Sequence, residues 1–506
     1  MRIISILILI LAILFLPGQA LSKGISSLDL NSVSIPAESG TIKEVYRSPA
    51  RAERGSKTIF HIQDAHGNYE AQKNLAAILE HLIKTYGLQV ILVEGGITDK
   101  DWSYLRSWAS PEERRRKAGA LLKEGIISGE AYVDISTDFQ LKFQGIEDKE
   151  LYEKNMEAYM AVDEFKKEAI EVLEALDEVL VELKKRIYTS RLRKFDESRE
   201  AYSAGKMELI EYIGYLDEVA AREKLDLSSY GNFSIFFDTV RMEKEIDFKK
   251  VEGERDSLIK SLTEAMDEGN MKELLMMSLK FKEGQIIAGD FYSRLRDMAL
   301  AHGVGLNKYA NLNKYIDYII NYERLDKIKL LDNLSEIEER FVEALCKSED
   351  QKRLFVIAKD VALLEKFFML RLSPEEFKYY KENKGSFVTA DWRDFLEGRA
   401  KRFRIKPQIP YDLTPVDKNL TALESFYNAA FDRDKAFLRN SLTKMEKEKA
   451  DISVLIAGGF HTENLKRLFM DEGISYIVIL PMLTEATDFE RFERIRLESY
   501  RTRAWD

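Results

Sequence analysis

The stretch Lys57–Gly96, KTIFHIQDAHGNYEAQKNLAAILEHLIKTYGLQVILVEGG, carries the pattern that decides the fold. Thr58–Gln63 places alternate residues on opposite faces, which is typical of a strand. An amphipathic helix is predicted to begin after Asn68 and to end at Gly87. The run Val90–Val93 is continuously apolar, as in strands buried within parallel sheets. The stretch therefore predicts a β-α-β unit.

Near the other end of the chain, Asp451–Pro481 (DISVLIAGGFHTENLKRLFMDEGISYIVILP) repeats this plan. Two apolar runs, Ser453–Ala457 and Ser475–Leu480, predict strands on either side of a glycine turn and a helix. Another strand is predicted at Leu141–Gly145. Because strands that alternate with helices form parallel sheets, we predict an α/β fold with a mostly parallel sheet and flanking helices. This sheet is built from the N- and C-terminal parts of the chain.

The middle of the chain predicts helices alone. Between Pro111 and Pro374 there is no proline, and the composition is rich in Glu, Lys, Leu and Met. Proline disrupts helix interiors, so its absence is typical of a long helical region. We predict a large all-helical insertion at residues 149–372, and its heptad-like stretches leave oligomerisation through the insertion open.

This insertion divides the predicted α/β domain in two. The first part is expected at residues 55–148 and the second at residues 405–485, followed by a charged C-terminal tail that reaches Asp506. Residues 22–54 are polar and contain scattered prolines, which predicts an irregular lead-in to the first strand.

The composition is that of a globular protein. Of the 506 residues, 45% are hydrophobic and 32% are charged, which allows a sizeable core. The net charge of -10 argues against a nucleic-acid binder, because phosphate backbones demand clustered Lys and Arg. The single cysteine, Cys346, excludes an intramolecular disulfide and a cysteine-rich metal site.

Residues 1–20 have the features of a signal peptide. Arg2 supplies an early positive charge, and Ile3–Leu16 is apolar apart from one serine. The small residues Gly18 and Ala20 mark a cleavage site. The apolar run is shorter than the roughly 20 residues that span a bilayer. We therefore expect an exported protein, periplasmic or secreted, with no stable membrane span after cleavage.

Three of the five histidines occur in or just after predicted strands of this sheet. His66 and His461 lie in glycine-containing turns after strands, where functional residues of α/β proteins gather. Near neutral pH a histidine can act as a general base or bind a metal ion. His61 lies within its strand, so a core position is an equal alternative for this residue.

Acidic residues are predicted at the same edge of the sheet. Glu94 directly follows an apolar strand and needs a partner if it is buried. It can orient a histidine or coordinate the same ion. Glu147 and Asp148 follow another strand, and they either join the site or only begin a helix, whose dipole favours acids there. Asp64 lies two residues before His66.

These motifs resemble those of the erythromycin esterase, ChaN and TraB/Tiki superfamily. Its members have a histidine turn after the first strand, a glutamate at the end of the second, and a C-terminal GxxH turn. Here these are Asp64–Gly67 (DAHG), Val93–Gly95 (VEG) and Gly458–His461 (GGFH). Arg433–Asn440 (RDKAFLRN) is similar to the RDxxMAxN helix of the esterase branch, with Phe437 in place of methionine.

The resemblance implies a hydrolase-like site. His66 would be the general base that activates water, Glu94 would align it, and Arg433 and His461 would hold the oxyanion. In the Tiki-like branch, equivalent positions are thought to bind a divalent metal such as Mn²⁺, so His66, Glu94 and His461 have an alternative role as metal ligands. ChaN-like members bind haem. A non-catalytic haem- or metal-binding protein is thus one alternative, and a helical scaffold with a relic α/β domain is another.

The first turn departs from the family pattern. It reads DAHG, whereas the esterase-type turn reads GEPTHG, and Asp64 takes the place of the acid that precedes the histidine there. Within these limits the sequence predicts an exported hydrolase. Its substrate is expected to be a small molecule or a peptide, cleaved at an ester or peptide bond.

Overall fold

The computed structural model describes Leu30 and residues 33–48, 57–65, 68–282, 286–325, 327–406 and 409–484. The expected signal peptide at residues 1–20 and His66 lie outside the described residues. The chain divides into two compact units. We call them the sheet unit (Lys23–Glu171, Glu365–Phe387 and Asp412–Asp506) and the helical unit (Val172–Leu364 and Val388–Tyr411).

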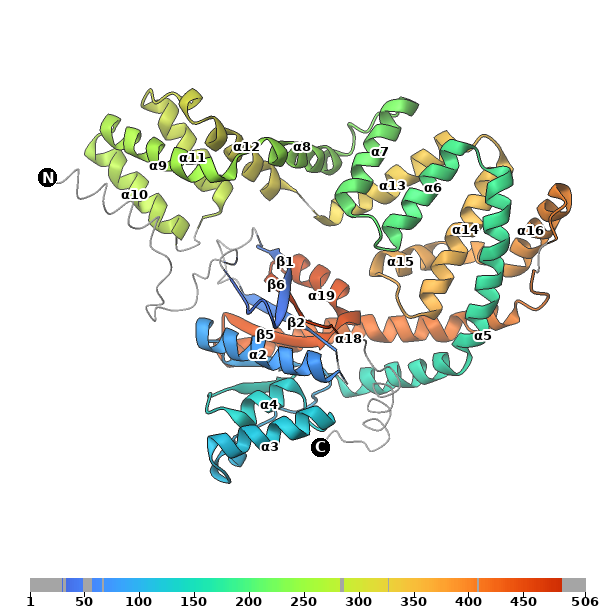
Figure 1. The fold of residues 1–506 in the computed structure, drawn as a ribbon, viewed down its shortest axis with the longest axis horizontal. Helices are drawn as coiled ribbons and strands as arrows, with labels where there is room; N and C mark the ends of the chain where they lie inside the picture. The colour runs from blue at the N-terminus through green and yellow to red at the C-terminus, as the bar shows by residue number, and fades with distance from the viewer. Residues whose placement is uncertain are drawn as a thin grey trace. The chain divides into compact units, whose positions relative to one another are not determined.

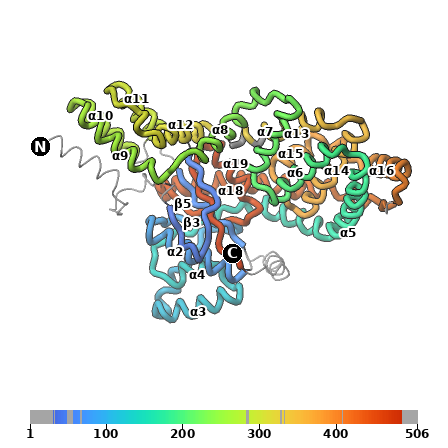
Figure 2. The backbone as a smooth tube through the Cα atoms, turned by 45° about the horizontal axis from the view of Figure 1, so that its top comes forward, coloured from blue at the N-terminus to red at the C-terminus, as the bar shows by residue number. Residues whose placement is uncertain are grey.

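The sheet unit contains a six-stranded mixed sheet with the order β1-β6-β2-β5-β3-β4. All neighbouring strands are parallel except β1 and β6. β2 lies between β5 and β6, so strands from both ends of the chain alternate, as the blue and red segments in Figures 1 and 2 show. The strands are β1 (Gly40–Tyr46), β2 (Thr58–Asp64), β3 (Val90–Val93), β4 (Lys142–Gly145), β5 (Ile452–Gly458) and β6 (Ser475–Pro481).

Strand β1 corrects the prediction of an irregular lead-in at residues 22–54. It forms the antiparallel edge of the sheet, where Gly40 pairs with Pro481 and Tyr46 with Tyr476. Most of its residues are partly exposed, and Lys43 and Glu44 interrupt its apolar pattern. Charged residues are common in edge strands because they discourage pairing with other chains. Because these charged residues interrupt the apolar pattern, the strand is difficult to predict from the sequence.

The two faces of the sheet pack against different helices. Successive residues of a strand point to opposite faces, and β2 shows this clearly. Phe60 and Ile62 are buried in a core with α2 (Tyr69–Tyr86). Ile59 is buried on the other face, in a core with α18 (Leu420–Lys447) and α19 (Gly459–Asp471). The sheet is therefore the middle layer of three.

Helix α2 has the ends that its sequence predicts. The Asn68 side chain accepts a hydrogen bond from the backbone N–H of Ala71, and Gly87 closes the helix in the left-handed conformation. The other helices of the sheet unit are α3 (Pro111–Glu124), α4 (Gly129–Ser136), α15 (Pro374–Glu382) and α17 (Thr414–Asp417).

All described elements from α5 (Lys149–Ile187) to α16 (Thr389–Phe403) are helices. The boundary between the two units falls within α5 and within α14. One core of the helical unit is formed by α9, α10, α11 and α12. The remaining helices are α6 (Ser190–Ser203), α7 (Leu209–Glu223), α8 (Gly231–Glu245), α9 (Phe248–Ala265), α10 (Glu268–Lys282), α11 (Ala288–Ala301), α12 (Ala310–Arg324), α13 (Lys327–Leu345) and α14 (Glu349–Phe368).

The structure thus confirms in outline the prediction of an α/β protein with an additional helical region. Within the described part of the chain, every helix is too short or too polar to cross a membrane.

Candidate functional site

The site lies at the carboxyl edge of the parallel strands, where ligands of open α/β sheets bind. Asp64 at the end of β2 pairs with Gly458 at the end of β5, and Val93 of β3 pairs with Gly145 of β4. Side chains that follow these positions are therefore neighbours. Glu94 directly follows β3 and Glu147 follows β4 by two residues. This sheet edge accordingly brings together segments from both ends of the chain.

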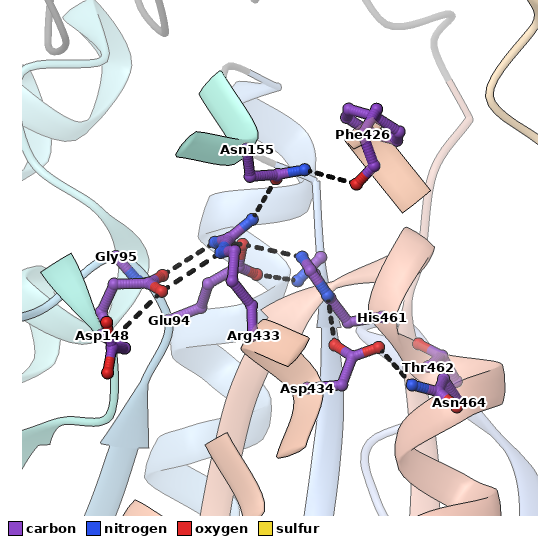
Figure 3. A network of polar contacts seen from close by, with 12 residues as sticks. Glu94, Gly95, Asp148, Asn155, Phe426, Arg433, Asp434, His461, Thr462 and Asn464 are labelled. Atoms are coloured by element: carbon purple, nitrogen blue, oxygen red, sulfur yellow. Dashed lines mark hydrogen bonds and ion pairs between the residues drawn. The ribbon is translucent and has the colours of Figure 1, made fainter. Parts of the chain in front are cut away.

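Arg433 of α18 is the centre of a buried polar network (Figure 3). Its two-point partner is Glu147. Arg433 Nε donates to Glu147 Oε1 at 3.1 Å and Nη2 donates to Oε2 at 2.7 Å. The Glu147 side chain is fully buried and that of Arg433 is 5% exposed. Although burial opposes the charge, Glu147 and Glu94 raise the pKa of the guanidinium above its usual value. Arg433 is a fixed cation beneath the sheet edge.

Three further contacts hold this cation. Arg433 Nη1 donates to Asn155 Oδ1 at 2.8 Å, and Asn155 Nδ2 donates to the carbonyl oxygen of Phe426 at 3.0 Å. The guanidinium carbon lies 5.0 Å from the Tyr152 ring centre and 5.3 Å from that of Phe437. Helix α5 thus supplies a hydrogen-bond acceptor and an aromatic ring to the same side chain, which leaves the guanidinium little freedom to turn.

Glu94 is the most accessible carboxylate of the network, with its side chain 14% exposed. Its Oε1 lies 3.2 Å from Arg433 Nη2 and 3.2 Å from His461 Nε2. Its Oε2 accepts the backbone N–H of Gly458 at 2.6 Å. Two cationic side chains therefore donate to a single oxygen atom, and a backbone amide at the start of α19 holds the other.

His461 lies in the first turn of α19 and is engaged at both ring nitrogens. Nδ1 donates to Asp434 Oδ1 at 2.5 Å, while Nε2 faces Glu94. Burial lowers the pKa of the ring, but the carboxylates of Glu94 and Asp434 overcome this effect and raise it to about 9. Near neutral pH His461 is accordingly an imidazolium, which donates hydrogen bonds and does not act as a base.

His61 is a core histidine. It is completely buried, and burial lowers its pKa to about 4, so the ring is neutral. Nε2 lies 2.8 Å from Thr462 Oγ1, and Nδ1 lies 3.4 Å from the carbonyl oxygen of Leu455. Because a carbonyl oxygen only accepts, Nδ1 of the neutral ring carries the proton and Nε2 accepts from Thr462 Oγ1; this hydroxyl oxygen in turn accepts from Gln63 Nε2 at 2.8 Å. These contacts stabilise the junction of β2 and α19.

The remaining predicted residues have different positions. Asp148 caps α5, because its Oδ1 accepts the backbone N–H of Leu151 at 3.1 Å. This is the helix-start role that the sequence left open for it, whereas Glu147 belongs to the network. Asp64 is buried at the sheet edge, and its Oδ1 accepts from Gln72 Nε2 at 2.5 Å. His66 lies outside the described residues, so its place in the site stays a prediction.

As it is hydrogen-bonded here, His461 does not offer a ligand to a metal ion. A metal binds a neutral imidazole with a free lone pair, whereas both ring nitrogens of His461 donate to carboxylates. The same contacts make His461 unsuitable as an axial haem ligand. Among the described residues, no group of three His, Cys, Asp or Glu side chains is arranged to hold a metal ion.

Two residues of the network, Asp434 and Asn155, were not predicted from the sequence. Asp434 stands beside Arg433 in the quoted motif, but the sequence does not tell which element it faces. Asn155 carries a weak signal, because Asp148, Tyr152 and Asn155 are spaced to share one side of α5. Because these three residues follow directly after a predicted strand, their spacing indicated that this side of α5 faces the sheet edge.

The arrangement combines three carboxylates with two cationic side chains in a largely buried place. Fixed donors of this kind can stabilise a negative charge that develops on a substrate oxygen. The most accessible member, Glu94, lies between the two cations and the start of α19. The chain matches no protein-family model, no curated protein and no solved structure.

Proposed function

We propose that this protein is an exported hydrolase of the erythromycin esterase, ChaN and TraB/Tiki type, which cleaves an ester or peptide bond. In this proposal His66 activates water, Glu94 aligns it, and Arg433 and His461 hold the oxyanion. The motifs that carry the resemblance, together with residues 1–20, support the assignment. The substrate is a small molecule or a peptide.

One observation carries the proposal. Arg433 Nη2 and His461 Nε2 point to the same oxygen atom, Glu94 Oε1, which lies 3.2 Å from each. An oxyanion hole requires such convergence of positively polarised N–H groups on one point. Both donors are cationic, and both are fixed from behind by buried carboxylates. In the resting protein the Glu94 oxygen stands in for the oxyanion of a substrate.

The proposed reaction begins when the carbonyl oxygen of the substrate displaces Glu94 Oε1 from the two donors. Glu94 remains near through its Oε2, which accepts the backbone N–H of Gly458. His66 removes a proton from water, and the water oxygen attacks the carbonyl carbon. The negative charge develops between Arg433 and His461. His66 then returns the proton to the leaving alcohol or amine as the tetrahedral intermediate collapses.

The test uses the purified full-length chain. Elemental analysis and absorption spectroscopy come first, followed by a panel of esters and peptides with and without Mn²⁺. We expect hydrolysis of at least one substrate, lost in His66→Ala and kept in His81→Ala. His81 is a suitable control because its ring contacts the backbone oxygen of Ser34 and the side chain of Thr85, away from the sheet edge.

Two outcomes contradict the proposal. An unchanged rate in a folded His66→Ala variant removes His66 as the base. A Soret band on haem reconstitution, without hydrolysis of any substrate, favours the haem-binding alternative instead.

A further inference from the structure

Asp434 is fully buried and has two partners, both in helix α19. Its Oδ1 accepts Nδ1–H of His461 at 2.5 Å, and its Oδ2 accepts Nδ2–H of Asn464 at 2.7 Å. Figure 3 shows this carboxylate on the side of the imidazole ring that faces away from Glu94. Each carboxylate oxygen has a separate donor, so the carboxylate cannot rotate without breaking a buried hydrogen bond.

We propose that Asp434 is the positioning residue of the site, which holds the His461 ring so that Nε2–H points at the oxyanion position. This inference rests on the hydrolase function proposed above. In the imidazolium both ring nitrogens carry a proton, and the hydrogen bond at one of them fixes the direction in which the other points. Because Asp434 accepts from Nδ1, the proton at Nε2 is directed toward Glu94.

The packing around the ring supports the same role. The Phe437 ring meets the His461 ring at 5.2 Å between centres and an interplanar angle of 64°. The Phe460 ring also contacts the His461 ring, with 5.4 Å between the ring centres and an interplanar angle of 82°. These aromatic contacts help to hold the ring in place, but they supply no hydrogen-bond partner to its nitrogens. The direction of the N–H groups therefore depends on Asp434 and Glu94.

The location of Asp434 links the two oxyanion donors. It directly follows Arg433 in α18, and consecutive helical residues point in directions about 100° apart. Arg433 therefore reaches Glu147 and Glu94, while Asp434 reaches α19. One rigid helical turn fixes the direct donor Arg433 and, through Asp434, the second donor His461. Their spacing is thus set by α18 rather than by a loop.

The first test measures the ring itself and needs no substrate. We label the full-length chain with ¹⁵N-histidine and record the ring nitrogens at one pH near 7, assigning His461 by its loss in His461→Gln. In the wild type we expect both nitrogens in the protonated range. In Asp434→Asn we expect one of them to move to the range of an unprotonated nitrogen, because an amide can donate to Nδ1 where the carboxylate only accepts.

The matched control is Asp432→Asn. Asp432 lies on the same helix two residues earlier, is half-exposed, and pairs with Lys435 at 3.0 Å rather than with the site. This variant should leave the His461 resonances unchanged. Asn464→Ala is the second variant, because it removes one bond to Asp434 without removing the carboxylate. It should broaden or shift the Nδ1 resonance while leaving it protonated.

The second test measures hydrolysis. Asp434→Asn should lower kcat by up to about 10²–10³-fold, the loss that follows removal of one oxyanion donor, because the Nε2–H donor loses its positive charge; KM should change little. Asn464→Ala should lower kcat several-fold, and Asp432→Asn should not change it. A His461 ring that keeps its protonation pattern in folded Asp434→Asn overturns the positioning role, as does an unchanged kcat. If Asp434→Asn does not fold, an unaltered Nδ1 resonance and kcat in Asn464→Ala overturn it.

The two tests separate the proposals. Loss of the resonance pattern in a chain that hydrolyses nothing supports the positioning of His461 and removes the hydrolase function. Hydrolysis at an unchanged rate in folded Asp434→Asn supports the hydrolase function and removes the positioning role.

Discussion

Arg433 and Glu147 form a two-point ion pair in which Nε lies 3.1 Å from Oε1 and Nη2 lies 2.7 Å from Oε2. The first residue comes from α18 and the second follows β4, and 286 positions separate them in the sequence. Parallel hydrogen bonds of this kind fix the plane of the guanidinium as well as its position. The pair therefore joins the two parts of the sheet unit and aims Nη2 at Glu94.

Removal of the negative partner should be costly. Glu147→Gln leaves a nearly buried guanidinium with less compensation, and loss of one partner of a buried ion pair typically costs about 3–5 kcal/mol. We expect a decrease of that size in the free energy of unfolding, measured by urea denaturation. Glu150→Gln is the control, because Glu150 is exposed in the first turn of α5. Equal stability of the two variants would show that Glu94 alone supports the Arg433 charge.

In the proposed hydrolase, the oxyanion donor His461 should matter to the rate more than to binding. In His461→Gln the cationic Nε2–H donor is replaced by a neutral amide, so stabilisation of the transition state decreases. We expect kcat to fall about 10²–10³-fold with a small change in KM. His302→Gln, in the helical unit, should behave as the wild type. A rise in KM at constant kcat would instead assign His461 to ground-state binding.

The strand ends could be predicted well because they depend on short, local sequence patterns. An apolar run followed by Glu94, or by the glycine turn before His461, identifies a strand and the residue that it presents at the sheet edge. Arg433 and Phe437 are four positions apart, the spacing at which helical residues share one side. The structure places the guanidinium 5.3 Å from the Phe437 ring, in agreement with that spacing.

Other features depend on which elements become neighbours, and no local pattern records this. Asp434 is a site residue only because α19 packs against α18, and Asn155 only because the start of α5 lies against α18. The sequence could not tell whether Glu147 and Asp148 join the site or begin a helix. The two residues are adjacent, and the direction of each side chain depends on the backbone conformation after β4. In the structure Glu147 belongs to the polar network and Asp148 caps α5.

The two buried histidines should give the stability a maximum near pH 6.5. Burial lowers the pKa of His61 to about 4, so its contribution is complete above the unfolded value of 6.5 and is lost as the pH falls toward 4. The pKa of His461 is raised to about 9, so its contribution is complete below 6.5 and is lost as the pH rises through 9. Each shift corresponds to about 3 kcal/mol.

Urea denaturation between pH 4 and pH 9 measures this dependence. We expect His61→Asn to flatten the acid limb and His461→Gln to flatten the alkaline limb, each without changing the other limb. A wild-type profile with no alkaline decrease would mean that His461 is not held as an imidazolium by Glu94 and Asp434.

The close approach of two loops at the sheet edge supplies a final prediction. A Cβ atom at Gly145 would lie 2.1 Å from the carbonyl oxygen of Gly96, and this oxygen accepts the backbone N–H of Glu147. Gly145→Ala must therefore push β4 and the Glu147 segment away from β3.

A comparable change at Gly119, within α3, meets only a Tyr132 ring atom at 4.0 Å. We expect Gly119→Ala to keep or increase stability by up to about 1 kcal/mol, because alanine favours helices. Gly145→Ala should instead lower the stability, and it should also remove the alkaline limb of the pH profile, because displacement of Glu147 disturbs Arg433 and hence Glu94. Thermal unfolding and the pH profile of the two variants test both parts, and equal stability would show that the β3–β4 edge can yield without cost.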